Sequence, residues 1–498
     1  MATPRRGAAR VAAADVDIAE YAGYDGVGLA ELVRKGQLSP RELAQTAARA
    51  IVAANRTVNA VVEVYADRID RLDETVLGNG PFRGVPFLIK DVGGHEARRK
   101  IEFGSRLCQG MVAEQDTHVG ELFRAAGLNI IGRSNAPEFS IAGTTENALY
   151  GNTSTPWRAG YSAGGSTGGG MAAVAAGMVP VAHGSDIGGS IRIPASWCGG
   201  VGLKPSRGRV SAGPLVEEGG WGLAMNFVQT RSVRDAAAML DCLAVPQPGD
   251  PFVIPRPAQP YQSFLQTPAA KLRVVWSAKP VMQMAVDPEV AAATERTARL
   301  LADMGHVVNE APPPYDGEEA NRRMLDLWFF GFDSWLDGFA AKLGRRIGPD
   351  TLEPVTLKIY EYARRSGAPG FFAARHYLNG VRRTLGRFLA DADVWLTPTT
   401  ARVAEPHGRY HQGLPDISAE DYLPFSDRPV QFTFPHNVMG TPAISLPLFM
   451  HSSGLPIGIQ LGAQPAQEHL LIQLAAALEE ALPWAGRVPP LHVSRTPA

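Results

Sequence analysis

Two serines lie in glycine-rich segments that could support acyl-transfer chemistry. Ser166 is flanked by glycines in the segment 164–170, and Ser190 follows two glycines in the segment 184–192. Successive backbone N–H groups without bulky side chains around them form an anion-binding concavity, which the tetrahedral intermediate of acyl transfer needs for its oxyanion. The two segments therefore predict a site that handles an acyl group.

Other uses of glycine-rich segments fit this sequence less well. A phosphate-binding loop of the form G-x-x-x-x-G-K-[ST] is absent, and the dinucleotide-like spacing of Gly168, Gly170 and Ala173 has no strand before it. The segment 164–168 does match the G-x-S-x-G nucleophile elbow of Ser-His-Asp hydrolases. An elbow serine should directly follow an apolar strand, whereas the segment 156–163 has the composition of a turn.

The general base of such a site could be a histidine or a lysine. His183 is the histidine nearest to the two serines, but a lone histidine near a strand end is more often a hydrogen-bonded structural residue. Lys90 ends an apolar run and is expected to point into the protein, where desolvation lowers the pKa of an amine. A fall of about 3 units would leave that amine largely neutral at pH 7. An ordinary lysine paired with Asp91 is the alternative.

The remaining composition argues against metal, nucleic-acid and membrane partners. His407 and His411 have metal-ligand spacing, but no cysteine pair or H-E-x-x-H motif accompanies them, so we expect no metal and no other cofactor. With 48 Lys+Arg against 49 Asp+Glu, the net charge of -1 does not favour nucleic acid. Three scattered cysteines fit the reducing cytoplasm rather than a disulfide framework. No apolar stretch reaches the ~20 residues of a membrane span.

The elements that must position these residues follow an α/β pattern. The run 84–89 reads as a short buried strand ending at Lys90, the run 119–126 as a helix, and the run 128–131 as the next strand. Strand, helix and parallel strand are the simplest interpretation, and sites in open α/β sheets gather at strand ends. An earlier helix is predicted to begin after Ser39, which opens a capping-box pattern.

The 498 residues would allow about two to four domains at roughly 100 to 200 residues each. A single α/β domain can nevertheless run well past that range, and we expect one here. Residues 1–20 have the character of a flexible leader, and we expect residues 21–498 to form a single domain. Within it, residues 245–430 contain clustered prolines, more charge and an aromatic stretch, as expected of a variable cap over the substrate. Apolar strand patterns return at 443–446 and 457–460.

Taken together, these segments resemble the amidase signature family. The run 84–91 resembles the family's lysine segment, 164–169 its first serine loop and 184–194 its nucleophile loop. Further blocks match in the family's order, at 144–147, 198–205, 396–399 and 440–445. The resemblance covers most of the chain. It implies a three-layer α/β/α fold around a large, twisted, mostly parallel mixed sheet.

The resemblance also implies a catalytic role for each central residue. Lys90 would be the base, Ser166 a bridging serine on a cis Gly165–Ser166 peptide, and Ser190 the nucleophile. Backbone N–H groups of four residues would form the oxyanion hole: Ile187, Gly188, Gly189 and Ser190.

Residues beside the expected triad depart in part from the family pattern. A loop that commonly reads Gly-Gly-Ser-Ser-Gly-Gly has Thr167 at its second serine, so a methyl group needs space there. Asp186 and Arg192 are interpreted as a partly buried ion pair that braces the nucleophile loop. Ile193 and Ser206 replace a glutamine and a threonine typical of the subunit of tRNA-dependent amidotransferases, which weakens that alternative.

Three further segments, 211–216, 434–437 and 482–484, resemble the branch with 6-aminohexanoate cyclic dimer hydrolases, aryl acylamidases and urethanases. This resemblance implies hydrolysis of C–N bonds in small apolar or aryl amides through an acyl-enzyme. Carbamates and esters are further expected substrates, because one acyl-enzyme route serves all three. A glutamine-dependent transamidation subunit and a non-catalytic binding module are the alternatives, and a homodimer is left open.

Substrate selection is expected to come from the walls around the scissile carbonyl, because the triad and the oxyanion hole contact only that group. The aromatic stretch 327–335 lies in the region least like the rest of the family. At helical spacing Trp328, Phe332 and Trp335 fall on one face, which either lines the substrate pocket or packs into the core.

Overall fold

The computed structural model describes residues 16–495, in which one 11-stranded sheet follows the order β1-β3-β2-β4-β6-β5-β10-β11-β9-β7-β8. The strands are β1 (Val61–Val64), β2 (Pro86–Lys90), β3 (Asn129–Ser134), β4 (Val181–Asp186), β5 (Val201–Lys204), β6 (Met225–Thr230), β7 (Arg273–Trp276), β8 (Val307–Glu310), β9 (Val394–Pro398), β10 (Ala443–Met450) and β11 (Pro456–Ala463). The predicted strand ending at Lys90 is thus confirmed as β2.

The sheet is mixed, as predicted, but the expectation that it is mostly parallel is wrong. Within residues 16–495, six strand pairings are antiparallel and four are parallel. The parallel pairing of β2 with β3 lies where the sequence indicated it. The antiparallel part was missed because β10 and β11 form a hairpin that inserts between β5 and β9, and antiparallel strands need only a short connection.

Two groups of helices cover the sheet: α3 (Pro40–Val58), α6 (Gly168–Ala175) and α7 (Arg192–Cys198), and α5 (His118–Ala125), α8 (Val233–Leu243) and α16 (Glu468–Ala481). In the first group α6 contacts α3 and α7, and in the second α8 contacts α5 and α16. The first group contacts β6 and β10 through α6 and α7, and the second contacts the same strands through α8 and α16. The strand β2 is buried along its whole length, as a strand covered on both faces must be. The layers therefore have the expected α/β/α order.

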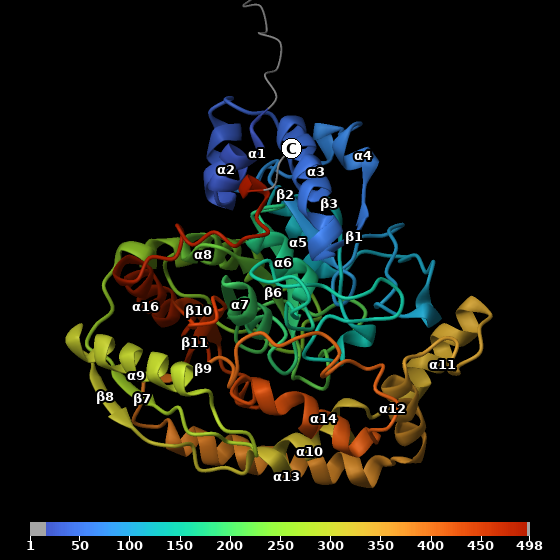
Figure 1. Cartoon of the computed structure of the whole chain (residues 1–498), viewed down its shortest axis with the longest axis vertical. Coiled ribbons are helices and arrows are strands. Elements are labelled where there is room, and N and C mark those ends of the chain that lie inside the picture. Colours follow the sequence, from blue (N-terminus) through green and yellow to red (C-terminus); the bar gives the residue numbers. More distant parts are fainter. Residues whose placement is uncertain (1–15, 496–498) are drawn as a thin grey trace, which may run out of the picture.

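The N-terminal part of the described chain forms helices above the sheet (Figure 1). They are α1 (Ile18–Gly23), α2 (Gly26–Arg34), α3 and α4 (Ala66–Ile69). The capping box predicted at Ser39 is confirmed, since Ser39 and Glu42 each accept a hydrogen bond from the other's backbone N–H. Of the expected leader, residues 1–15 lie outside the described residues, and α1 begins at Ile18. Short 3-10 turns occur at Glu74–Val76, Arg106–Cys108, Glu138–Ser140, Tyr261–Gln266, Arg428–Val430 and Val493–Arg495.

Most of the later helices gather at the opposite end of the molecule from α1 to α4 (Figure 1). They are α10 (Gly317–Trp328), α11 (Phe332–Leu343), α12 (Pro354–Arg365), α13 (Ala368–Phe388) and α14 (Ala419–Asp427), while α9 (Pro288–Asp303) contacts β8, β9 and β11, and α15 (Phe434–Met439) contacts α13. Apart from α9, which packs into the larger cluster around the sheet, these helices share a second apolar cluster with segments that include Phe103 and Phe139.

The expectation that Trp328, Phe332 and Trp335 share one helix face is wrong. Trp328 ends α10 and Phe332 begins α11, because Gly331 between them has φ +81°. Glycine adopts this left-handed conformation without the steric penalty that a β-carbon brings, so the helix is interrupted there.

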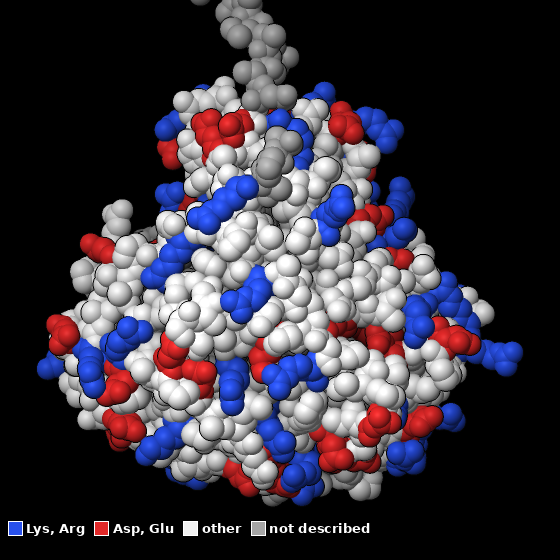
Figure 2. Space-filling view, in the orientation of Figure 1, with Lys and Arg blue, Asp and Glu red and all other residues white. Residues whose placement is uncertain are grey.

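Positive and negative side chains are interspersed over the face shown in Figure 2. Among residues 16–495, no helix is both long and apolar enough to cross a membrane. The same residues contain no group of three or more His, Cys, Asp or Glu side chains arranged to hold a metal ion.

Candidate active site

The end of β2 places the Lys90 amine beside two hydroxyl groups. Its side chain is 1% exposed, and Nζ donates hydrogen bonds to Ser166 Oγ at 2.7 Å and to Ser185 Oγ at 3.0 Å. Burial lowers the pKa of Lys90 to about 7, against the opposing attraction of Asp186. Near neutral pH a large share of this amine is therefore uncharged and able to accept a proton.

Asp91 does not pair with Lys90, so the alternative of an ordinary lysine paired with Asp91 is wrong. Its carboxylate accepts the backbone N–H groups of Glu102 at 2.8 Å and Gly104 at 2.9 Å. It also pairs with Arg133, which is buried. Asp91 thus anchors the loop that follows β2, and within residues 16–495 the hydrogen-bond partners of the Lys90 amine are neutral hydroxyl groups.

Ser166 is held in a tightly packed turn before α6. The Gly165–Ser166 peptide is cis, as predicted. A β-carbon on Gly165 would come within 2.6 Å of Thr144 N, so only glycine fits there. Thr145 secures the turn, because its hydroxyl donates to Gly164 O at 2.8 Å.

The sequence left open whether the methyl group of Thr167 has enough space, and the structure provides that space. β-Carbons built on Gly170 and Gly184 would come within 3.2 and 3.1 Å of Thr167 Cγ2, so these two glycines make room for it. The Thr167 hydroxyl donates to Ser185 O at 3.3 Å, and the Thr167 N–H donates to Ser190 O at 3.2 Å. Thr167 therefore joins the two serine segments.

The nucleophile loop between β4 and α7 presents a row of backbone N–H groups. In residues 16–495 no protein atom accepts a hydrogen bond from the N–H groups of Ile187, Gly188, Gly189 or Ser190. Gly189 has φ +141°, a conformation that side chains rarely adopt. Thr433 holds this turn from outside, because its hydroxyl donates to Gly188 O. Four unpaired donors in one loop could stabilise an oxyanion.

Asp186 and Arg192 form the predicted ion pair at the base of this loop, and it is fully rather than partly buried. Arg192 Nη2 lies 2.8 Å from Asp186 Oδ1, and Nε lies 2.9 Å from Oδ2. Burial alone would raise the pKa of Asp186, but Arg192 and its other partners hold it down, to about 2. Arg192 also donates to Thr433 O and to the side chains of Gln460 and Asn437.

The Ser190 backbone lies beside the segment of Ser166, because the N–H of Thr167 donates to Ser190 O, and within residues 16–495 no hydrogen bond joins the two serine side chains. Ser190 is buried, with 8% of its surface exposed, whereas Ile187 and Gly188 of the same loop are partly exposed. Catalytic hydrogen bonds are often long or misaligned before substrate binds. The missing hydrogen bond between the two serines therefore does not by itself exclude proton transfer between them.

His183 is a structural residue, as the sequence favoured. Its Nδ1 accepts the Lys90 N–H at 3.3 Å, its Nε2 lies 3.3 Å from Asn226 Oδ1, and its ring packs on Phe123. Burial and then the positive charge of Lys90 lower the pKa of His183 to about 3. A ring nitrogen of such low basicity is a poor general base at neutral pH.

Two of the three predicted pocket aromatics contact the ring of Phe139, and the third does not. Phe332 and Trp335 contact the Phe139 ring, with centroid distances of 5.7 and 5.5 Å. The chain continues from Phe139 to Thr144, which packs on Gly165. Trp328 stacks instead on Phe329.

Ser185, Thr433 and Phe139 were not singled out from the sequence. Ser185 had a signal, because it lies within the same glycine-rich segment as Ser190. Thr433 reaches the site through tertiary packing, and Phe139 meets the predicted pocket aromatics in the same way. No local spacing indicates either contact.

Comparison with known proteins places this α/β fold and its serine and lysine segments in a class of amide hydrolases. Residues 42–472 match the Amidase family. The chain belongs to this family.

Individual relatives span nearly the whole chain. The 6-aminohexanoate-cyclic-dimer hydrolase of Pseudomonas sp. (strain NK87) is 38% identical over 483 residues, which cover 94% of this chain and 96% of that protein. The acylamidase of Rhodococcus erythropolis is 33% identical over 471 residues, covering 93% and 96%. A solved structure of 6-aminohexanoate cyclic dimer hydrolase complexed with substrate superposes with a TM-score of 0.89 at 36% identity, covering 94% of this chain and 99% of that chain.

Proposed function

We propose that this protein is a serine amide hydrolase in which Ser190 is the nucleophile, Ser166 the proton bridge and Lys90 the base. The observation that carries the proposal is the buried Lys90 amine, 2.7 Å from Ser166 Oγ and with a pKa lowered to about 7. Family membership and the four unpaired N–H groups beside Ser190 support the same assignment.

In the first half-reaction the base acts through the bridge. Neutral Lys90 takes the proton of Ser166 Oγ, Ser166 takes that of Ser190 Oγ, and Ser190 Oγ attacks the carbonyl carbon. The N–H groups of residues 187–190 bind the oxyanion that forms. When the tetrahedral intermediate collapses, the C–N bond breaks and the proton returns through Ser166 to the leaving amine.

In the second half-reaction water replaces the amine. Water gives a proton to the same relay, its oxygen attacks the acyl-enzyme carbonyl, and Ser190 leaves with the proton returned to Oγ. The products are a carboxylic acid and the amine. A carbamate or an ester would follow the same route, so we include urethane and ester cleavage as proposed side activities.

The proposed substrates are small apolar or aryl amides, linear or cyclic. Phe139, Phe332 and Trp335 contact one another in an aromatic group. We propose that this group forms a wall of the substrate pocket, because aromatic walls favour flat or apolar groups. We propose that residues 245–430, which supply two of these rings, act as the substrate cap. A cytoplasmic location is also proposed, because the three cysteines are free.

The test is an assay of the isolated full chain with a small anilide and, separately, with glutamine. Hydrolysis of the anilide that disappears in Ser190→Ala supports the proposal. Strict preference for glutamine would favour the transamidation alternative, and no turnover of any amide, carbamate or ester would favour a binding module. Mass spectrometry after a serine-directed covalent inhibitor should place the adduct on Ser190.

A further inference from the structure

A cavity of about 250 Å³ lies between the segment 207–223 and the helices α10, α13 and α15. The triad side chains do not line it, so it is distinct from the candidate catalytic centre. Ligand pockets commonly measure about 300–1,000 Å³, so this one suits a small ligand or one end of a longer ligand.

The cavity carries positive charge that the protein does not neutralise. Arg207, Arg375 and Arg382 line it, against one carboxylate, Glu218. Within residues 16–495 none of the three arginines forms an ion pair, and Arg382 has a neutral partner, Asn379 Oδ1, at 2.9 Å. Burial and the charges of Arg382 and Arg375 lower the pKa of Arg207, as expected where like charges face one another.

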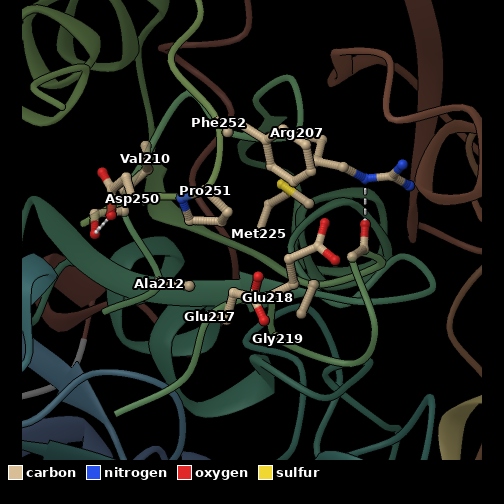
Figure 3. Close-up of a pocket in the computed structure, with 14 residues that line it drawn as sticks. Arg207, Val210, Ala212, Glu217, Glu218, Gly219, Met225, Asp250, Pro251 and Phe252 are labelled. Atoms are coloured by element: carbon tan, nitrogen blue, oxygen red, sulfur yellow. Dashed lines mark hydrogen bonds between the residues drawn. The ribbon is translucent and has the colours of Figure 1, made fainter. Parts of the chain in front are cut away.

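Among the described residues, the hydrogen bonds that fix Arg207 all go to main-chain oxygens. Its guanidinium donates to Gly222 O, to Asn437 O at 2.9 Å and to Val438 O at 3.3 Å. Arg207 also lines a smaller neighbouring cavity of about 30 Å³. Figure 3 shows the Arg207 side chain extending past Phe252, away from the other labelled residues of that cavity. Arg207 thus lines both cavities, and within residues 16–495 no carboxylate forms an ion pair with it.

We propose that the larger cavity binds the carboxylate of a small organic anion. Guanidinium groups match carboxylates with two parallel hydrogen bonds, and three of them around one cavity supply more charge than Glu218 can balance. Apart from Asn379, the other lining residues are apolar and include Trp221, Leu223 and Leu327. The ligand therefore has an apolar body, such as a phenyl ring or a short alkyl chain, attached to its carboxylate.

The site borders the nucleophile loop. Asn437, whose main-chain oxygen accepts from Arg207, donates its side-chain N–H to Asp186 O at 3.1 Å and to Leu223 O at 3.1 Å. A β-carbon on Gly220 would lie 2.2 Å from Ile187 Cδ1, so the wall segment also touches the proposed oxyanion hole. The carboxylate could thus belong to the far end of an amide substrate or to a free acid, such as the product of hydrolysis.

Titration calorimetry with benzoate tests the site, with benzyl alcohol as the uncharged isostere. The double variant Arg375→Gln/Arg382→Gln should weaken benzoate binding at least about tenfold relative to the unmodified chain. The matched control is Arg383→Gln, an exposed residue of the same helix that does not line the cavity, and it should bind benzoate as the unmodified chain does. Melting temperatures of all variants show that each is folded. Absence of saturable benzoate binding, or equal binding by the double variant, would overturn the proposal.

A kinetic comparison separates the two sources of carboxylate, and this part rests on the proposed function. Glutaric acid monoanilide carries a terminal carboxylate, and pentananilide has nearly the same length without it. If the substrate supplies the carboxylate, the kcat/KM ratio of the charged to the neutral anilide falls about tenfold in the double variant. If a free acid is the ligand, that ratio stays constant while benzoate binding is lost. A chain that hydrolyses neither anilide would contradict the proposed function, and the benzoate titration would still decide the site.

Discussion

Thr433 lies so close to Gly189 that a β-carbon on the glycine would come within 2.3 Å of the threonine hydroxyl oxygen. The same hydroxyl donates a hydrogen bond to Gly188 O, so α15 and the turn before it hold the nucleophile loop in the shape that leaves its N–H groups unpaired. The two adjacent glycines of this loop therefore differ in what they tolerate, although they look equivalent in the sequence.

We expect Gly189→Ala to lower kcat/KM for an anilide by about 10²- to 10³-fold, the usual effect of losing one oxyanion donor. The new methyl group meets Thr433, and φ +141° is unfavourable for alanine, so the loop must shift. Gly188→Ala is the matched control, because a β-carbon there meets no atom within 4 Å and the backbone N–H is kept. Similar activity in both variants would contradict this account of the loop.

The rate should depend on pH through the amine of Lys90. Because the active form of the base is neutral and the pKa of Lys90 is about 7, kcat/KM should rise roughly tenfold per pH unit below pH 7 and level off above it. The rate falls toward low pH because protonation gives the Lys90 amine a charge, and the charged amine cannot accept a proton. Measurements from pH 4.5 to 9 with a non-ionising anilide check this, and a maximum near pH 5 would exclude a lysine base.

The three proposed catalytic side chains should behave as one unit. We expect Ser190→Ala to abolish turnover, while Lys90→Ala and Ser166→Ala keep a low residual rate because the nucleophile and the N–H groups remain. The Lys90→Ala/Ser166→Ala double variant should lose little more than either single variant, since each change alone already breaks the relay. Additive losses would mean that the two residues act independently.

Trp335 should influence substrate choice more than stability. It is 43% exposed and contacts Phe139, whereas Trp328 stacks on Phe329 away from that ring. Trp335→Ala is expected to change the kcat/KM ratio of an anilide to an aliphatic amide by about 10- to 200-fold. Trp328→Ala serves as the control and should lower the melting temperature with the ratio unchanged. A constant ratio in both variants would remove Trp335 from the substrate pocket.

Sequence reasoning located the parts of the fold whose signals are local. The apolar run before Lys90 predicts β2, and the Ser39 capping box predicts the start of α3. The place of β10 and β11 between β5 and β9 could not be read in this way, because strand pairing depends on surfaces far apart in sequence. Gly331 did carry a local signal for a helix break, and the spacing of the aromatic residues obscured it.

In the candidate site, too, residues with a local sequence signal could be predicted and residues brought in by long-range contacts could not. Lys90, Ser166 and Ser190 stand in segments whose glycines and apolar runs are visible in the sequence, and the structure brings the Lys90 amine to Ser166. The contact of Ser185 with Lys90 was not predicted, because a serine inside a strand carries no special signal. Thr433 comes from a helix N-terminus 245 residues away from its partner Gly188, and chain separation of that size leaves no local trace.

The long reach of these contacts has a consequence for biosynthesis. Arg192 depends on Thr433 O, 241 residues later, and on Gln460 Oε1, 268 residues later, to satisfy its buried guanidinium. A growing chain has made Lys90, Ser166 and Ser190 long before it makes those acceptors, and an unsatisfied buried charge is strongly unfavourable. We therefore expect the loop that carries Ser190 to stay unorganised during synthesis until the final strands are added, so that the proposed activity appears only in the completed chain.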